Sequence, residues 1–310
     1  IRLVISMNEG TTKQVLITGG AGYVGQVILD NMPDNWKATV IDNVYGGNNN
    51  FQPSENIEFV KGDIRNESLM EKLIAKNDAV IHLAGIVGDS CPNNPKSAQK
   101  INVDATEKIA KFCNQVEKRL IFMSTCSVYG FNEKTCTEET ELNPLNAYSD
   151  HKVLGENVIK YNSNNHLIFR LGTVYGWSPR MRFDLGINLF IEKSLWKEEI
   201  QVYGGNQWRP VIHVKDAARG LVMAVEAWDL NTTLNLVGEN HLVLDLAKQI
   251  SDKINVVDAK DDNRSYKVDN SRILEKLKWR PTMDINSAKS EFQKVNYQED
   301  IYYNKRWNYE

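Results

Sequence analysis

The sequence predicts an α/β fold, a doubly wound parallel sheet of the Rossmann type followed by a smaller mixed lobe. Three observations predict it. Up to about residue 176, short apolar runs alternate with segments of helical spacing. A glycine cluster joins the first apolar run to the first helical segment. Beyond residue 176 the alternation ends, and short elements of mixed type follow.

The first unit is a strand, a glycine turn and a helix. Residues 15–17 form an apolar run of strand length, and apolar residues at helical spacing begin at Val24. Between them stand Gly19, Gly20 and Gly22, with Gly25 one turn into the helix. Glycines let a backbone turn tightly and approach a pyrophosphate, whose charge is stabilised at a helix N-terminus. This order of elements predicts a dinucleotide site.

The second apolar run, residues 38–41, ends at Asp42. This carboxylate follows the glycines by about 20 residues, the spacing typical of a group that binds the ribose diol of a dinucleotide. A carboxylate there accepts hydrogen bonds from the diol and repels a 2′-phosphate. The sequence therefore predicts NAD as the cofactor in preference to NADP.

The remaining elements continue the alternation. Further strands are expected at residues 57–60, 79–83, 120–123 and 167–171, and helices at 67–75, 95–116 and 144–161. A long helix is expected at about 214–229, and a short strand at 234–237. We therefore expect an NAD-binding domain over residues 13–176, joined by the 214–229 helix. Residues 177–213 and 230–310 form the smaller lobe, with the ligand cleft between the two.

Composition bears on partners and compartment. The 37 Lys and Arg nearly balance the 40 Asp and Glu, and the tryptophans show no stacking pattern, so neither nucleic acid nor an anionic membrane surface is expected as a partner. No apolar run approaches the roughly 20 residues of a membrane span. Residues 1–6 are too short for a secretory signal, and Met7 is a candidate native start. The four cysteines lack metal-binding or CxxC spacing, so we expect reduced thiols, no metal and a cytoplasmic protein.

Tyr148 and Lys152 lie four residues apart and so share one helical face. The lysine charge, helped by a bound nicotinamide cation, is expected to lower the pKa of the tyrosine. Tyr148 then removes a proton from a substrate hydroxyl while the nicotinamide takes the hydride. The preceding strand ends in a hydroxyl-rich segment, residues 123–130, at the sheet edge where ligands bind.

Together these motifs resemble one family from residue 14 to about residue 294, the extended short-chain dehydrogenase/reductases of the NAD-dependent epimerase/dehydratase group. Members act on nucleotide-diphosphate sugars. The segments that carry the resemblance are residues 18–25, 62–65, 82–85, 101–106, 124–130, 148–152, 209–216, 264–269 and 279–281.

The resemblance implies roles for individual residues. The catalytic residues are Thr125, Tyr148 and Lys152. The cofactor contacts are Gly19, Gly22, Tyr23, Val24, Gly25, Asp42, Asn43, Asp63, Ile64, Leu83, Ala84, Gly85, Asn102, Tyr148 and Lys152. The substrate contacts are Thr125, Cys126, Ser127, Arg182, Asn188, Arg209 and Arg264, with Cys126 as a small residue lining the pocket.

The family shares a first step, oxidation of a sugar C4 hydroxyl with NAD. Its 4,6-dehydratases carry Asp-Glu where this chain has Cys126 and Ser127, and its decarboxylases carry glutamate at the second position. Neither activity is therefore favoured. A 3,5-epimerase/reductase is disfavoured too, because its cysteine falls at Ser127 by register. The small polar triplet at residues 125–127 resembles that of 4-epimerases, which return the hydride to the other face of the keto sugar.

Two alternatives remain open. Thr173 stands where family epimerases commonly have asparagine, so a net 4-dehydrogenase or 4-ketoreductase of nucleotide sugars is the first alternative. A non-catalytic module that only binds NAD is the second, and the Thr125, Tyr148 and Lys152 set argues against it. The resemblance also implies a homodimer, paired through the helices at 95–117 and 144–162.

Overall fold

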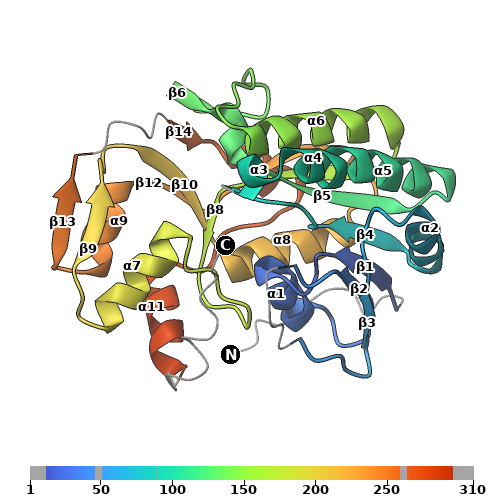
Figure 1. The fold of residues 1–310 in the computed structure, drawn as a ribbon, viewed down its shortest axis with the longest axis horizontal. Helices are drawn as coiled ribbons and strands as arrows, with labels where there is room; N and C mark the ends of the chain where they lie inside the picture. The colour runs from blue at the N-terminus through green and yellow to red at the C-terminus, as the bar shows by residue number, and fades with distance from the viewer. Residues whose placement is uncertain (1–11, 46–50, 89, 259–263, 296–310) are drawn as a thin grey trace.

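The structure is a computed structural model, and it describes residues 12–45, 51–88, 90–258 and 264–295 (Figure 1). The expectations for residues 1–6, Met7 and the end of the lobe after residue 295 lie outside the described residues. The predicted α/β class is confirmed: a seven-stranded parallel sheet is joined to smaller sheets in the C-terminal part of the chain.

The main sheet has the strand order β11-β7-β5-β4-β1-β2-β3. Each pair of neighbours in it is parallel. The chain runs outward from β1 to β3 and then returns to place β4 on the other side of β1. This reversal opens a crevice at the carboxyl ends of β1 and β4, which is where open α/β sheets bind ligands. The strands are β1 (Gln14–Thr18), β2 (Lys37–Asp42), β3 (Ile57–Lys61), β4 (Ala79–His82), β5 (Arg119–Thr125), β7 (His166–Leu171) and β11 (Thr232–Leu236).

Helices cover both faces of this sheet (Figure 1). On one face α1 (Tyr23–Asn31) packs against α8 (Val214–Glu226); on the other, α5 (Ala105–Gln115) lies between α2 (Glu67–Lys76) and α6 (Ala147–Asn162). Strand β1 shows why both faces are needed, because Val15 and Ile17 pack in the core cluster that includes α1 and α8, while Leu16 packs in the cluster on the opposite side. Apolar residues on both faces of a strand require two covering layers.

The expected helix at 95–116 is divided. It consists of α4 (Pro95–Gln99), a π-helical turn (Lys100–Asp104) and α5, and a short α3 (Ser90–Asn93) precedes it. Such turns interrupt the 3.6-residue spacing and often mark functional sites. Asn102 lies in this turn, where its side chain reaches the segment after β4.

Among the residues that the structure describes, the other strands form three small sheets. Strand β10 (Trp208–His213) pairs with β8 (Thr173–Tyr175) and β12 (Glu239–Leu242), β9 (Ile200–Tyr203) with β13 (Ile254–Val257), and β14 (Ser265–Val268) with β6 (Phe131–Cys136). The remaining helices of the described residues are α7 (Gly186–Leu195), α9 (Val243–Ile250), α10 (Ser271–Lys276) and α11 (Ile285–Lys294).

Three strands pair across the domain boundary expected from the sequence. Strand β11 lies in the range expected for the lobe, yet it pairs with β7 in the main sheet. Strands β6 and β8 lie within residues 13–176, yet they pair with β14 and β10 of the lobe. These pairings join strands over long sequence separations, which the local pattern of one strand does not encode. The domain limits themselves stay a prediction.

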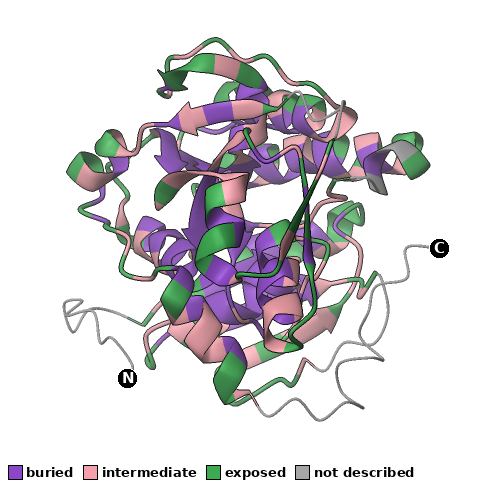
Figure 2. Cartoon of the chain, turned by 90° about the vertical axis from the view of Figure 1, so that its left-hand side faces the viewer, coloured by how far each residue is buried: buried purple, intermediate pink, exposed green. Residues whose placement is uncertain are grey.

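Buried residues fill the interior of the molecule (Figure 2). Strands β4 and β7 of the main sheet are buried throughout, whereas the edge strand β3 has exposed residues at Glu58 and Lys61. None of the helices within the described ranges combines the length and apolar character of a membrane span. In the same ranges, no three His, Cys, Asp or Glu side chains gather in an arrangement that could hold a metal ion.

Candidate active site

The glycine turn between β1 and α1 leaves no room for side chains. Gly19 has φ +69°, and a Cβ added to it would lie 2.8 Å from the Ala84 backbone nitrogen. A Cβ on Gly25 would lie 2.5 Å from Gly20 Cα. The turn is therefore pressed against the end of β4 and the first turn of α1. Gly22, the N-cap of α1, offers no side-chain cap, so the N–H groups of the first turn stay available to an anion.

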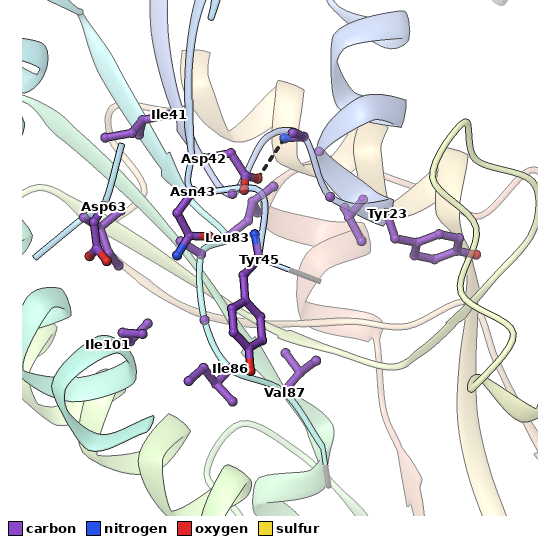
Figure 3. Close-up of a pocket in the computed structure, with 18 of the residues that line it drawn as sticks. Tyr23, Ile41, Asp42, Asn43, Tyr45, Asp63, Leu83, Ile86, Val87 and Ile101 are labelled. Atoms are coloured by element: carbon purple, nitrogen blue, oxygen red, sulfur yellow. Dashed lines mark hydrogen bonds between the residues drawn. The ribbon is translucent and has the colours of Figure 1, made fainter. Parts of the chain in front are cut away.

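This turn forms one wall of a cavity of about 330 Å³, within the range of small-molecule sites (Figure 3). Most of the predicted cofactor residues line it. They are Gly19, Gly22, Tyr23, Val24, Gly25, Asp42, Asn43, Asp63, Ile64, Leu83, Ala84 and Gly85, joined by Arg182 from the predicted substrate set.

Asp42 lies at the end of β2, on the rim of the cavity. Its Oδ2 accepts a hydrogen bond from the Ala21 N–H at 3.2 Å, and its Oδ1 accepts one from the Val44 N–H at 2.8 Å. Burial raises the pKa of Asp42, whereas these hydrogen bonds and the nearby Arg180 charge act to lower it. The carboxylate thus lies against the glycine turn, the position expected of a group that binds a ribose diol.

Several residues of the cavity wall were not selected from the sequence. They are Ala21, Ile41, Tyr45, Gly62, Arg65, Ile86, Val87, Asn94, Ser97, Ile101, Met123 and Arg180. Five of them follow the carboxyl ends of β2, β3 and β4 within a few residues, so for these the nearby motif was the available signal: Tyr45, Gly62, Arg65, Ile86 and Val87. Arg65 makes an ion pair of 2.6 Å with Asp63, and its hydrogen bonds hold the pKa of that carboxyl below its usual value.

Asn102 holds the backbone of one residue of the cavity wall, Ile86. Its Oδ1 accepts a hydrogen bond from the Ile86 N–H, and its Nδ2 donates to the Ile86 carbonyl, both at 2.8 Å. The side chain thereby satisfies both backbone groups of a residue that lines the cavity. Its predicted direct contact with the cofactor stays a prediction.

The three predicted catalytic residues lie close together at the end of β5. Lys152, on α6, donates its ammonium to the Met123 carbonyl at 2.7 Å, and it lies 5.9 Å from the centroid of the Tyr148 ring. Thr125 lies close enough to Tyr148 for its hydroxyl to lower the pKa of the phenol. Its Oγ1 also lies 3.0 Å from the Ser127 hydroxyl. A phenol, an ammonium and two hydroxyls therefore meet beside Met123, which lines the cavity.

The electrostatics of the pair are dominated by desolvation. Burial raises the pKa of Tyr148 to about 12, against the opposing effects of the Arg182 charge and the Thr125 hydroxyl. Burial also lowers the pKa of Lys152 to about 8. The sequence predicts that the pKa of Tyr148 is lowered when a nicotinamide cation is bound beside Lys152. This stays a prediction for the cofactor-bound protein.

The predicted substrate residues are spread more widely. Arg182 lines the cavity and pairs with Asp184. Arg209 donates to the carbonyls of Trp208 and Arg264, which brings the two arginine segments together. Their predicted contacts with substrate, and that of Ser127, stay predictions.

Two residues of this set are buried, and the substrate contact predicted for Asn188 stays a prediction. Cys126 is 1% exposed, and its thiol donates to the Arg170 carbonyl, so it lies in the core instead of the cavity lining that the sequence suggested. The physical reason is the helical turn of residues 126–129, which directs the thiol inward. Asn188 is fully buried, and its amide bonds to Gly176, Tyr23 and Arg182.

A buried ion pair that was not predicted from the sequence lies next to β5, the strand that ends in Thr125. Arg170 Nη2 lies 2.8 Å from Glu156 Oε2, and the Ser124 hydroxyl donates to Glu156 Oε1 at 2.7 Å. Burial opposes the ionisation of Glu156, but Arg170 outweighs it and lowers the pKa of the carboxyl. The available signal was an arginine inside the apolar run 167–171.

The chain is similar to known proteins in sequence and in fold. The chain matches the model of the NAD dependent epimerase/dehydratase family over residues 15–236. A putative UDP-glucose 4-epimerase of Methanocaldococcus jannaschii is 32% identical over 294 residues, which cover 88% of this chain and 95% of that protein. UDP-glucuronic acid decarboxylase 1 of Xenopus tropicalis is 28% identical over 309 residues, 91% of this chain and 72% of that protein.

A solved structure shares the fold. The UDP-N-acetylglucosamine 4-epimerase from Methanobrevibacter ruminantium, in complex with UDP-N-acetylmuramic acid, superposes with a TM-score of 0.80 at 26% identity, covering 92% of this chain and 99% of that one. In the present structure, the tight glycine turn, the uncapped start of α1 and the carboxylate of Asp42 fit a dinucleotide. The chain therefore belongs to the NAD dependent epimerase/dehydratase family, and NAD is its cofactor.

Proposed function

We propose that this protein is an epimerase of nucleotide-diphosphate sugars that oxidises the sugar transiently at C4. The observation that carries the proposal is the set of groups around Tyr148. Thr125 and Lys152 flank the phenol, Ser127 adds a hydroxyl 3.0 Å from that of Thr125, and the Cys126 thiol is turned away into the core. This set can move one proton at one hydroxyl, which is all that a 4-epimerase needs.

The residues divide the work. Thr125 orients the C4 hydroxyl, Tyr148 takes its proton, and the Lys152 ammonium stabilises the resulting phenolate. When bound, NAD supplies a reversible acceptor for the hydride. The keto sugar then turns in the pocket, and Tyr148 returns the proton as the hydride is delivered to the other face. Arg182, Arg209 and Arg264 hold the substrate diphosphate, because guanidinium groups match phosphate oxygens.

Elimination or decarboxylation would need a further acid or base beside the hydroxyl. Cys126 and Ser127 supply none, and the buried carboxylate of Glu156 is already held by Arg170 and Ser124. These activities are therefore not proposed, although one relative is named as a decarboxylase. The candidate that remains beside epimerisation is a net 4-dehydrogenase or 4-ketoreductase, because Thr173 in β8 replaces the asparagine common among epimerases.

Two further features belong to this proposal. We expect a homodimer paired through α5 and α6, which lie side by side; exposed apolar side chains lie on α6 and just after α5. Leu154 is 43% exposed on α6, and Tyr161 near its end is 90% exposed. Size-exclusion chromatography with light scattering would contradict this expectation if it gave only monomer. A cytoplasmic location is also proposed, and the four free, buried cysteines support it.

The test is to incubate the purified protein with a panel of UDP, dTDP, GDP and CDP sugars while following absorbance near 340 nm and separating products. An isomeric sugar with only trace reduced cofactor supports the epimerase. Stoichiometric NADH with a keto product would instead establish the net dehydrogenase. Tyr148→Phe separates either enzyme from a module that only binds NAD, because it should remove about 10²–10⁴-fold of turnover while NAD still binds.

A further inference from the structure

Tyr23 joins the cofactor turn to the segment that enters the C-terminal lobe. It is the first residue of α1, and it lines the cavity, yet its ring points away from the other labelled residues (Figure 3). The phenol is 6% exposed. Its hydroxyl donates to the Gly176 carbonyl at 2.7 Å and accepts from Asn188 Nδ2 at 3.1 Å.

A second contact attaches the same segment to the backbone of Tyr23. The hydroxyl of Ser178, which is fully buried, donates to the Tyr23 carbonyl at 2.7 Å. Asn188 fixes the segment from α7, since its Oδ1 accepts from the Gly176 N–H and its Nδ2 donates to the Arg182 carbonyl. Residues 176–182 are thus fastened between α1 and α7 by buried hydrogen bonds.

Residues 176–182 place two positively charged side chains at the cavity. Arg180 and Arg182 both line it, although they come from the lobe side of the sequence. The Arg180 charge acts on Asp42, and the Arg182 charge acts on both Tyr148 and Tyr23. Their placement therefore depends on a segment whose anchor is the residue that begins the cofactor helix.

We propose that Tyr23 is a positioning residue that couples the binding of NAD to the placement of residues 176–182. The backbone of Tyr23 lies at the cofactor cavity, and its hydroxyl holds residues 176–182. A shift of the first turn of α1 therefore moves Arg180 and Arg182 as well. The cofactor half of this inference stands on the family's NAD. Its consequence for a substrate diphosphate rests on the proposed function.

The test is hydrogen–deuterium exchange of peptides covering residues 176–185, with and without saturating NAD. In the unmodified protein, NAD should slow exchange in this segment. Tyr23→Phe keeps the ring but leaves the Gly176 carbonyl and one Asn188 N–H without their partner. We expect it to bind NAD within about threefold of the unmodified affinity and to reduce the NAD-induced protection by about fivefold, as the loss of these two buried hydrogen bonds implies.

Tyr129→Phe is the matched control. Tyr129 is also a buried tyrosine, but its hydroxyl donates to Asn235 Oδ1 at 2.6 Å and accepts from Arg170 Nη1 at 3.0 Å, both outside residues 176–182. It should preserve the protection. Ser178→Ala, which removes the second contact without altering the ring, should reduce it and serves if Tyr23→Phe fails to fold.

Three outcomes would overturn the proposal: equal NAD-induced protection in Tyr23→Phe and the unmodified protein, equal loss in Tyr129→Phe, or abolished NAD binding by a folded Tyr23→Phe. A second measurement addresses the substrate side by titrating NAD with and without saturating UDP. UDP should tighten NAD binding in the unmodified protein and do so several-fold less in Tyr23→Phe. If UDP does not bind the unmodified protein, a UDP sugar is excluded as its substrate, while the exchange result still decides the role of Tyr23.

Discussion

Lys152 donates its ammonium to the carbonyl oxygen of Met123 at 2.7 Å, so the helix that carries the phenol is tied to the strand that ends in Thr125. The lysine is 4% exposed and lies 4.6 Å from the centroid of the Phe122 ring. A charge held in such surroundings is stabilised by one carbonyl and one aromatic face, but it has lost most of its water. Its cost to folding follows from its pKa.

The first prediction concerns the pH dependence of that cost. The pKa of Lys152 is lowered by burial to about 8 from its ordinary 10.5, so between these values the unfolded chain binds more protons and stability rises with pH. The penalty is fully present below pH 8 and is on the order of 3 kcal/mol. Lys152→Met removes it. The stability of this variant relative to the unmodified protein should therefore be greatest at pH 7 and should fall between pH 8 and 10.5.

Urea unfolding of both proteins at pH 7, 8, 9 and 10 measures this difference. Effects of other titrating groups cancel between the two proteins. A difference that stays constant over this pH range would show that Lys152 folds with an ordinary pKa.

The second prediction concerns the buried ion pair of Arg170 and Glu156. Removing one partner leaves an uncompensated buried charge, so Glu156→Gln should destabilise the protein by about 3–5 kcal/mol. Replacing both, as Glu156→Leu with Arg170→Met, should recover much of this loss because no charge stays buried. Chemical denaturation of the three proteins tests it, and equal stability of the single and double variants would contradict it.

The Arg170 and Glu156 pair also shows which features the sequence alone does not predict. The glycine turn, Asp42 and the Tyr148 helix each have a local pattern, and the structure places Asp42 and the glycines around one cavity. Glu156 and Arg170 carry no such pattern, because their partnership depends on packing across 14 residues of separation and two different elements. The inward direction of Cys126 and the pairing of β6 with β14 were missed for the same reason: each is decided by a tertiary contact.

The third prediction concerns cofactor choice at Asp42. Replacing it with serine removes the carboxylate that repels a 2′-phosphate and the acceptor for the ribose diol. Asp42→Ser should weaken NAD binding by about tenfold, as expected for the loss of charge-assisted hydrogen bonds. The ratio of the NAD affinity to the NADP affinity should fall by more than about tenfold, because the repulsion of the 2′-phosphate is lost as well. Calorimetric titration with each cofactor measures both values.

Glu58→Ser is the control for Asp42, since Glu58 is an acid on neighbouring β3 that pairs with Lys76 at the surface and does not line the cavity. It should leave both affinities unchanged. If the ratio of NAD affinity to NADP affinity is unchanged in Asp42→Ser, the carboxylate does not face the ribose.

The fourth prediction separates backbone strain from crowding in the glycine turn. Gly19 and Gly88 have similar positive φ angles, +69° and +54°, so alanine is strained at both by about 1–2 kcal/mol. Only at Gly19 does the added Cβ meet backbone atoms, with Ala84 nitrogen at 2.8 Å, whereas at Gly88 it meets nothing within 4 Å. Gly19→Ala should therefore lose clearly more stability than Gly88→Ala.

The excess loss has to come from moving β1 away from the end of β4, because the backbone of Ala84 cannot yield as a side chain could. That movement also opens the wall that faces the pyrophosphate, so Gly19→Ala should lose NAD binding by tenfold or more while Gly88→Ala keeps it. Urea denaturation and NAD titration of the two variants measure the two effects. Equal losses in both variants would mean that strain alone explains the glycine, and that the close approach of β1 to β4 is not needed for the cofactor.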